Sequence, residues 1–122
     1  MRRRRTFLLI AGPLVILLAL FIISFSYYNT RVAAPKRIQQ ELLGRVIVDY
    51  ADLTYYQADT AYGEGILIWI YRLNDGEAAR LAADCREFDR GRCVVAEDVR
   101  REDTHRFIFA VGNRLRIEEW WN

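Results

Sequence analysis

The longest apolar run of the chain lies close to its start. Residues 7–28 include no charged side chain, and consecutive arginines at positions 2–5 precede them directly. An α-helix rises about 1.5 Å per residue, so this run is long enough to cross the roughly 30 Å hydrocarbon core of a bilayer. Tyr27 and Tyr28 end the run, where aromatic rings suit the boundary between lipid and water. The pattern predicts a transmembrane helix over residues 7–28.

Two cleavable leaders are the alternatives to this anchor. A secretory signal has an apolar run of about 7–15 residues with small residues before the cut, which Ser24 and Ser26 could supply. The run is longer than that, however, and Phe25 and Tyr27 crowd such a site. A twin-arginine signal would use residues 4–8, a short match that any run of arginines produces easily. We expect an uncleaved anchor.

The balance of basic residues around the run predicts its orientation. Residues 1–6 hold four arginines, whereas three basic residues, Arg31, Lys36 and Arg37, follow the run, so the excess at the front is small. Cytoplasmic flanks of membrane helices are enriched in Lys and Arg. We therefore expect a single-pass protein of the cell (inner) membrane with a cytoplasmic basic segment at its N-terminus. After the helix we expect a linker at 29–35 and an extracytoplasmic domain at 36–122.

The sequence pattern in the first part of this domain predicts a short helix and two strands. Pro35 suits a first helical turn, Ile38 and Leu42 share one face, and Gly44 suits the end. Residues 45–57 favour a strand, 58–65 a turn, and 65–73 the strongest strand of the chain. The last of these is apolar on both faces, so it is either covered on both sides or presents one face to a partner. Its faces hold Ile66, Ile68 and Ile70 on one side, and Leu67, Trp69, Tyr71 and Leu73 on the other.

The second part predicts a helix followed by three strands. Asn74 is a suitable N-cap for an amphipathic helix that runs to about Asp89 and ends at Gly91. A short strand at 94–96 and a charged loop at 97–105 follow. Residues 106–111 and 114–121 then form a hairpin around Gly112-Asn113, a type II′ pattern that sets Ile108 opposite Ile117, and Phe107 and Phe109 opposite Glu118 and Arg116. The fold class is therefore α+β, with an antiparallel sheet of four to five strands and two short helices.

The two cysteines bear on the expected compartment of the domain. Cys85 lies near the end of the predicted helix and Cys93 at the start of the next strand, so the pair can reach disulfide distance. Disulfides persist outside the cytosol, which agrees with the predicted orientation. Two free thiols in a cytoplasmic domain remain the alternative.

Charge and motifs exclude several classes of function. The chain carries a net charge of +2, but beyond the first six residues it has 14 basic and 16 acidic side chains. No stripe of basic residues is present that could bind nucleic acid. No serine follows Ser26, and Cys93 with the lone His105 is more typical of a structural cysteine and a loop histidine. We expect no cofactor, no metal and no enzymatic activity. The only acidic grouping of interest comprises Asp49, Asp52, Asp59 and Glu64.

These observations predict a membrane-anchored extracytoplasmic module that binds another protein, as an accessory subunit of an envelope complex or as a homo-oligomer. An inhibitory, immunity-type binder that uses the acidic grouping is one alternative, and a small envelope hydrolase or ligand sensor is another. Terminal aromatic residues are often docked on their own domain, but they are also enriched at binding hot spots. The candidate contact residues are Trp69, Tyr71, Phe107, Phe109, Trp120 and Trp121.

Overall fold

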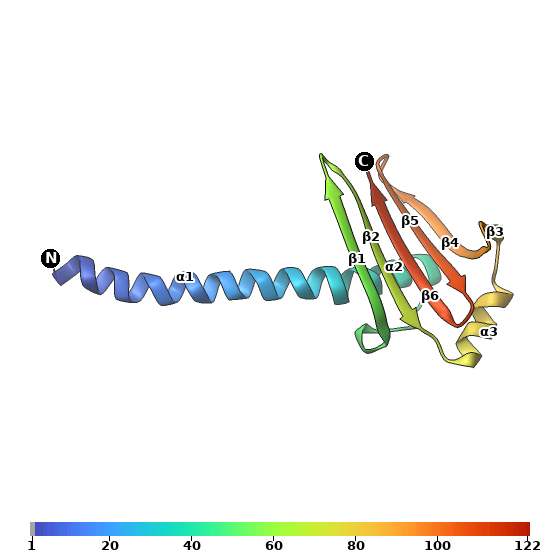
Figure 1. The fold of residues 1–122 in the computed structure, drawn as a ribbon, viewed down its shortest axis with the longest axis horizontal. Helices are drawn as coiled ribbons and strands as arrows, with labels where there is room; N and C mark the ends of the chain where they lie inside the picture. The colour runs from blue at the N-terminus through green and yellow to red at the C-terminus, as the bar shows by residue number, and fades with distance from the viewer. Residues whose placement is uncertain (1) are drawn as a thin grey trace.

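The computed structural model describes residues 2–122 and has an α+β fold (Figure 1). A long N-terminal helix leads into an antiparallel sheet of six strands, one or two more than expected, in the order β1-β2-β6-β5-β4-β3. Two helices, α2 and α3, lie on one face of this sheet. The elements in chain order are α1 (Arg2–Tyr28), η1 (Asn29–Ala33), α2 (Ala34–Leu43), η2 (Tyr50–Asp52), β1 (Leu53–Ala61), β2 (Glu64–Arg72), α3 (Asp75–Ala83), β3 (Glu87–Asp89), β4 (Arg92–Arg100), β5 (Thr104–Val111) and β6 (Arg114–Trp121).

The N-terminal helix continues without a break into the domain. Within the described part of the chain, residues 4–43 form one helix that is long and apolar enough to cross a membrane. The segment 29–35, expected as a linker, is helical and includes the π-helical turn η1. There the N–H of Ala34 donates to the carbonyl of Asn29, five residues back. Pro35 has no N–H to continue this pattern, so the carbonyl of Thr30 is left free for another donor.

A buried glutamine explains why the strand predicted over 45–57 begins only at Leu53. Gln39 of α2 is a polar residue that is fully buried. Its amide oxygen accepts from the N–H groups of Ile47 (2.8 Å) and Val48 (3.1 Å), and its amide nitrogen donates to the carbonyl of Val48 (3.1 Å). These bonds replace the ladder that a strand would need, and they hold Val48 against the core.

The β1–β2 hairpin is longer and tighter than expected. The predicted turn at 58–65 shrinks to Tyr62 and Gly63, which both have positive φ (51° and 81°), as a type I′ turn requires. β2 is confirmed as a strand inside the sheet, between β1 and β6. Trp69 and Tyr71 point to the helix side, where they are 0% and 1% exposed.

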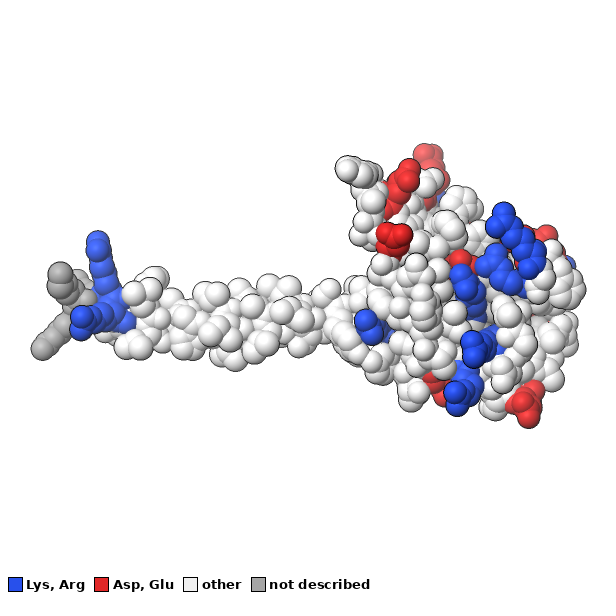
Figure 2. Space-filling model, viewed as in Figure 1, with Lys and Arg blue, Asp and Glu red and all other residues white. Residues whose placement is uncertain are grey.

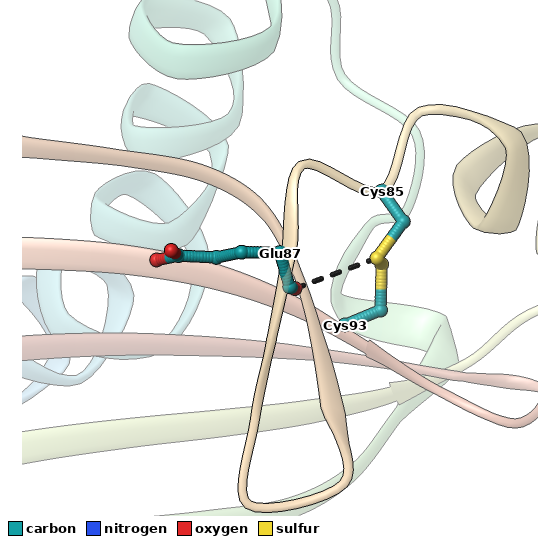
Figure 3. The surroundings of a disulfide bond; sticks show 3 residues. All are labelled: Cys85, Glu87 and Cys93. Atoms are coloured by element: carbon teal, nitrogen blue, oxygen red, sulfur yellow. Dashed lines mark hydrogen bonds between the residues drawn. A yellow bond between two sulfur atoms is a disulfide. The ribbon is translucent and has the colours of Figure 1, made fainter.

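The helix after Asn74 is shorter than predicted. The Asn74 side chain caps α3 as expected, accepting from the N–H of Glu77 at 2.8 Å, but α3 ends at Ala83 instead of continuing to Asp89. Residues 87–89 form β3 instead, and the Cys85 and Cys93 sulfurs lie 2.04 Å apart at the base of the β3–β4 hairpin (Figure 3). The predicted pairing is thus confirmed at disulfide distance. Phe88, which falls within the helix predicted to run to Asp89, lies instead on β3 and is 78% exposed.

The strands β4 and β5 extend into the region predicted as a charged loop. Asp98 is paired with Arg106 across the two strands, and Arg106 also reaches Glu41 on α2. These ion pairs satisfy the charged side chains within the sheet. β4 therefore extends to Arg100, and β5 begins at Thr104. The β5–β6 register is as predicted, with Ile108 opposite Ile117.

The hydrophobic core lies between the helices and one face of the sheet. Ile38 of α2 and Leu81 of α3 pack there against Trp69, Ile108 and Ile117. Because both helices lie on this side, the other face of the sheet has no helix over it (Figure 1).

Candidate functional site

The sheet face away from the helices, here called the open face, is built from three rows of side chains that cross β2, β6 and β5. Residues directly opposite one another on neighbouring strands are in contact distance, so each row forms a continuous strip. The rows are Ile66–Trp120–His105, Ile68–Glu118–Phe107 and Ile70–Arg116–Phe109. Most of these residues line a hollow of about 700 Å³, with Asp89, Arg90, Arg92 and Asn122 at its rim.

Aromatic and aliphatic side chains dominate this hollow. The rings of Phe107 and Phe109 stack with centroids 5.7 Å apart. Phe109 is almost fully covered, whereas Trp120 remains 46% exposed at the end of its strand. Ile66 and Ile68 of β2 extend the apolar surface towards β1. Ile68 is also buried, at 6% exposed, whereas Ile66, Ile70 and Phe107 are half-buried. The accessible part of these apolar groups, of which Trp120 is the most exposed, forms a surface of the kind that marks protein contacts.

A charge network fixes the middle of the open face. Glu118 is only 2% exposed, and its Oε2 lies 3.3 Å from Nη1 of Arg92 and 3.5 Å from Nε of Arg116. The Arg92 guanidinium also lies 4.3 Å above the Phe109 ring, a cation–π contact, and pairs with Asp89 at 3.4 Å. A buried carboxylate needs such partners, because desolvation without them is costly. The network therefore holds the Arg92 guanidinium over the Phe109 ring.

Basic side chains outnumber acidic ones around the hollow. Three arginines, Arg90, Arg92 and Arg116, face two carboxylates, Asp89 and Glu118. Figure 2 views this side of the molecule and shows basic side chains in a band across the domain, with acidic ones gathered at the tip of the β1–β2 hairpin. An acidic group on a binding partner would be favoured over the middle of the face.

The structure separates the six predicted contact residues into three groups. Phe107, Phe109 and Trp120 lie together on the open face. Trp69 and Tyr71 belong to the core, so they have to be removed from the contact set: α2 and α3 cover the face of β2 on which they lie. Trp121 lies on the helix side over Gly65, where an added Cβ would be 2.2 Å from its ring.

The acidic grouping is also divided. Asp49 and Asp52 flank η2 at the start of β1, whereas Asp59 and Glu64 line a hollow of about 280 Å³ at the hairpin tip. Asp59 follows Asp52 by seven positions along an extended strand, which is roughly 23 Å. Within residues 2–122 there is no cluster of three or more His, Cys, Asp or Glu side chains that could hold a metal ion.

Several residues of the open face were missed from the sequence. Opposition of Phe107 and Phe109 to Glu118 and Arg116 was predicted, because the type II′ turn sets that register locally. β2 pairs with β6, and Arg92 lies over Phe109. Both contacts join residues far apart in the chain, so no local sequence pattern predicts them.

Comparison with known proteins does not extend these observations. No protein-family model matches the chain, and neither a curated protein nor a solved structure matches it. The functional evidence therefore lies in the chain's own residues.

Proposed function

We propose that this chain is a non-enzymatic, membrane-anchored module that binds another protein outside the cytosol, as an accessory subunit of an envelope complex. The observation that carries the proposal is the open face: an apolar and aromatic sheet surface that no helix covers. An apolar face of a sheet is normally buried against another layer, and the helices cover only the opposite face of this sheet. A second protein would supply that layer here.

The anchor supports the proposed location. Side chains between Phe7 and Phe25 are largely exposed and apolar, which in water would be unfavourable and in lipid is not. The arginines that precede the apolar run support a cytoplasmic N-terminus, and the paired cysteines support an oxidising compartment for the domain. The proposed membrane is the cell (inner) membrane.

The composition of the open face suggests the chemistry of the partner. Trp120, Ile66 and Phe107 would contact apolar side chains, as aromatic anchors do at binding hot spots. Arg92 and Arg116 would attract carboxylates placed beside those apolar groups. The expected partner therefore presents an apolar patch with acidic residues within it or around it.

Site-specific photo-crosslinking in native membranes tests this proposal. A p-benzoylphenylalanine at position 120 should give a discrete adduct, because this position lies at the exposed end of the open face. The matched control places the same group at Phe88, an exposed aromatic on the other side of the molecule. Arg116→Glu should weaken the adduct from position 120. The proposal fails if position 120 gives no adduct, or if both positions give the same ones.

The hairpin tip favours a second candidate, an inhibitory, immunity-type binder. Asp59 and Glu64 line their hollow together with Trp120, so a basic target could contact carboxylates and an indole at once. Charge reversal at Asp59 and Glu64 would then abolish protection against that target, whereas Asp52→Arg would not. Loss of binding by Arg116→Glu with retention in the tip variants would reject this candidate.

A further inference from the structure

We infer that the β1 edge of the domain, lined by tyrosines, rests on the lipid headgroup layer of the bilayer that the proposed anchor spans. The occupant of this surface is thus the bilayer interface, not a further protein. The inference rests on the membrane-anchor part of the proposed function and is independent of the open face. It follows from the positions along the N-terminal helix at which η2 and β1 contact that helix.

The rise of the helix places its residues relative to the bilayer. From residue 7, a hydrocarbon core of about 30 Å takes up about 20 residues, which brings the boundary close to Tyr27. The headgroup layer adds roughly 5–7 Å, or about three to five residues, so it spans about residues 27–31. Any part of the domain that touches this segment of the helix must lie at headgroup depth.

The start of the sheet touches that segment. The Tyr50 hydroxyl of η2 is hydrogen-bonded to the Tyr27 hydroxyl, and the two rings meet edge to face with centroids 6.1 Å apart. The Arg31 guanidinium lies between two rings, 5.0 Å from that of Tyr27 and 4.5 Å from that of Tyr56 on β1. These contacts set η2 and β1 beside the part of the helix that would cross the headgroups.

The orientation of the sheet agrees with this depth. Figure 1 shows the strands stacked along the axis of α1, with β1 nearest to the N-terminal end and β4 and β3 farthest from it. The tip of the β1–β2 hairpin leans back along α1. Because the helix passes through η1 without a break, no free linker separates the domain from the proposed anchor.

Tyrosines gather on this edge. The chain has seven tyrosines, and all except the buried Tyr71 lie at the end of α1 or along η2, β1 and the β1–β2 turn. Tyr50, Tyr55 and Tyr62 are 40%, 48% and 106% exposed. A phenol ring is stable at a membrane interface, where its body contacts lipid and its hydroxyl contacts water. The headgroup layer would also shield β1, a nine-residue edge strand whose outer N–H and C=O groups lack a strand partner.

Depth measurements on the full chain in phosphatidylcholine nanodiscs test the inference. A nitroxide is attached to Tyr62→Cys, Arg90→Cys or Leu17→Cys, while the native cysteines remain paired. Positions 62 and 90 are a matched pair, since each has φ of 51° and precedes a glycine in a hairpin turn, one beside β1 and one beside β3. Accessibility to oxygen is then compared with accessibility to a water-soluble nickel chelate.

The label at position 17 should be highly accessible to oxygen. Accessibility to the nickel chelate should be several-fold lower at position 62 than at position 90. Equal nickel accessibility at 62 and 90, with position 17 embedded, would overturn the inference alone. An aqueous position 17 would instead overturn the proposed anchor. Labels at Gln57→Cys on β1 and Val99→Cys on β4 provide a second pair should a turn label disturb its hairpin, and the same difference is expected.

Exchange of the tyrosines tests their role directly. Tyr50→Ser with Tyr55→Ser should raise nickel accessibility at position 62 towards that at position 90. Trp120→Ser, which removes an exposed aromatic from the open face, should leave it unchanged. No change in the tyrosine double variant would show that these rings do not hold the edge at the interface.

Discussion

The indole N–H of Trp69 donates a hydrogen bond to the carbonyl oxygen of Thr30 at 3.0 Å. In the π-helical turn η1, this carbonyl would accept from residue 35, but Pro35 has no N–H. A tryptophan from the middle of the sheet thus supplies the bond that the proline cannot make. The contact ties the helix to the core at the point where the helix enters the domain.

Removal of this bond should destabilise the domain. In Trp69→Phe the Thr30 carbonyl loses its partner in a partly buried site, and part of the indole volume is lost as well. We expect the free energy of unfolding to fall by about 2–4 kcal/mol. Urea denaturation of the full chain in detergent measures this. Trp120→Phe, at an exposed site, is the control and should change the value by less than about 0.5 kcal/mol; equal effects would contradict this role for Trp69.

Arg106 joins α2 to the sheet through two carboxylates. Its side chain is 3% exposed, its Nε lies 2.8 Å from Oδ1 of Asp98, and it also pairs with Glu41. Hydrogen bonds to Asp98 and Glu41 raise the pKa of the guanidinium further above its ordinary value. Because both carboxylates are partly exposed, Arg106→Leu should lower the free energy of unfolding by about 1–3 kcal/mol rather than the full cost of a buried pair.

Two companion variants separate the partners of Arg106. Arg106→Lys should recover only part of the loss, since an ammonium cannot make the two-pronged contact to Asp98. Glu41→Gln should cost less than about 1 kcal/mol. A larger loss for Glu41→Gln than for Arg106→Leu in the same denaturation experiment would show that the helix–sheet link depends on something else.

The Cys85–Cys93 bond closes a short loop around β3. Cys85→Ser with Cys93→Ser should lower the free energy of unfolding by about 2–3 kcal/mol in the chain-entropy model. Few other contacts hold β3, because it has three residues and pairs only with β4. Hydrogen exchange should therefore rise first in residues 85–93, while the amides of β5 stay protected. Uniform loss of protection across the sheet would be at odds with this local role.

Gly65 leaves room for the Trp121 ring. A Cβ at Gly65 would lie 2.2 Å from that ring, so Gly65→Ala should cost about 1–3 kcal/mol. In the Trp121→Ala background the same change should cost much less, which a double-mutant cycle measures. Gly76→Ala is the control, since its nearest neighbour would be 3.5 Å away and alanine favours a helix. Additive costs at Gly65 and Trp121 would rule out the proposed clash.

Local patterns were enough to predict much of this fold. The apolar run, the cap of α3 by Asn74, the strand β2 and the register around Gly112 all depend on residues close together in the chain. Periodicity and turn chemistry act at that range. The same range covers the cysteine pair, which is separated by eight positions.

Distant contacts decided the rest. Val48 has the sequence of a strand residue, but Gln39 takes its backbone hydrogen bonds. The sequence of residues 97–105 is typical of a charged loop, but the pairing of Arg106 with Asp98 allows strands to form there. Three of the nine residues of the open face, Phe107, Phe109 and Trp120, were predicted as contact residues. The inclusion of Ile66 and Ile68 depends on a strand order that no local pattern encodes.

Thiol labelling in intact cells tests most directly the central claim that the anchored domain lies outside the cytosol. Cys85 and Cys93 should resist a membrane-impermeant maleimide until an impermeant reductant is added, and both should then react. A chain with Arg5→Cys and both native cysteines replaced by serine is the control, and it should react only with a permeant reagent. Reaction of Cys85 and Cys93 with the permeant reagent alone, without reductant, would place the domain in the cytosol and contradict the account.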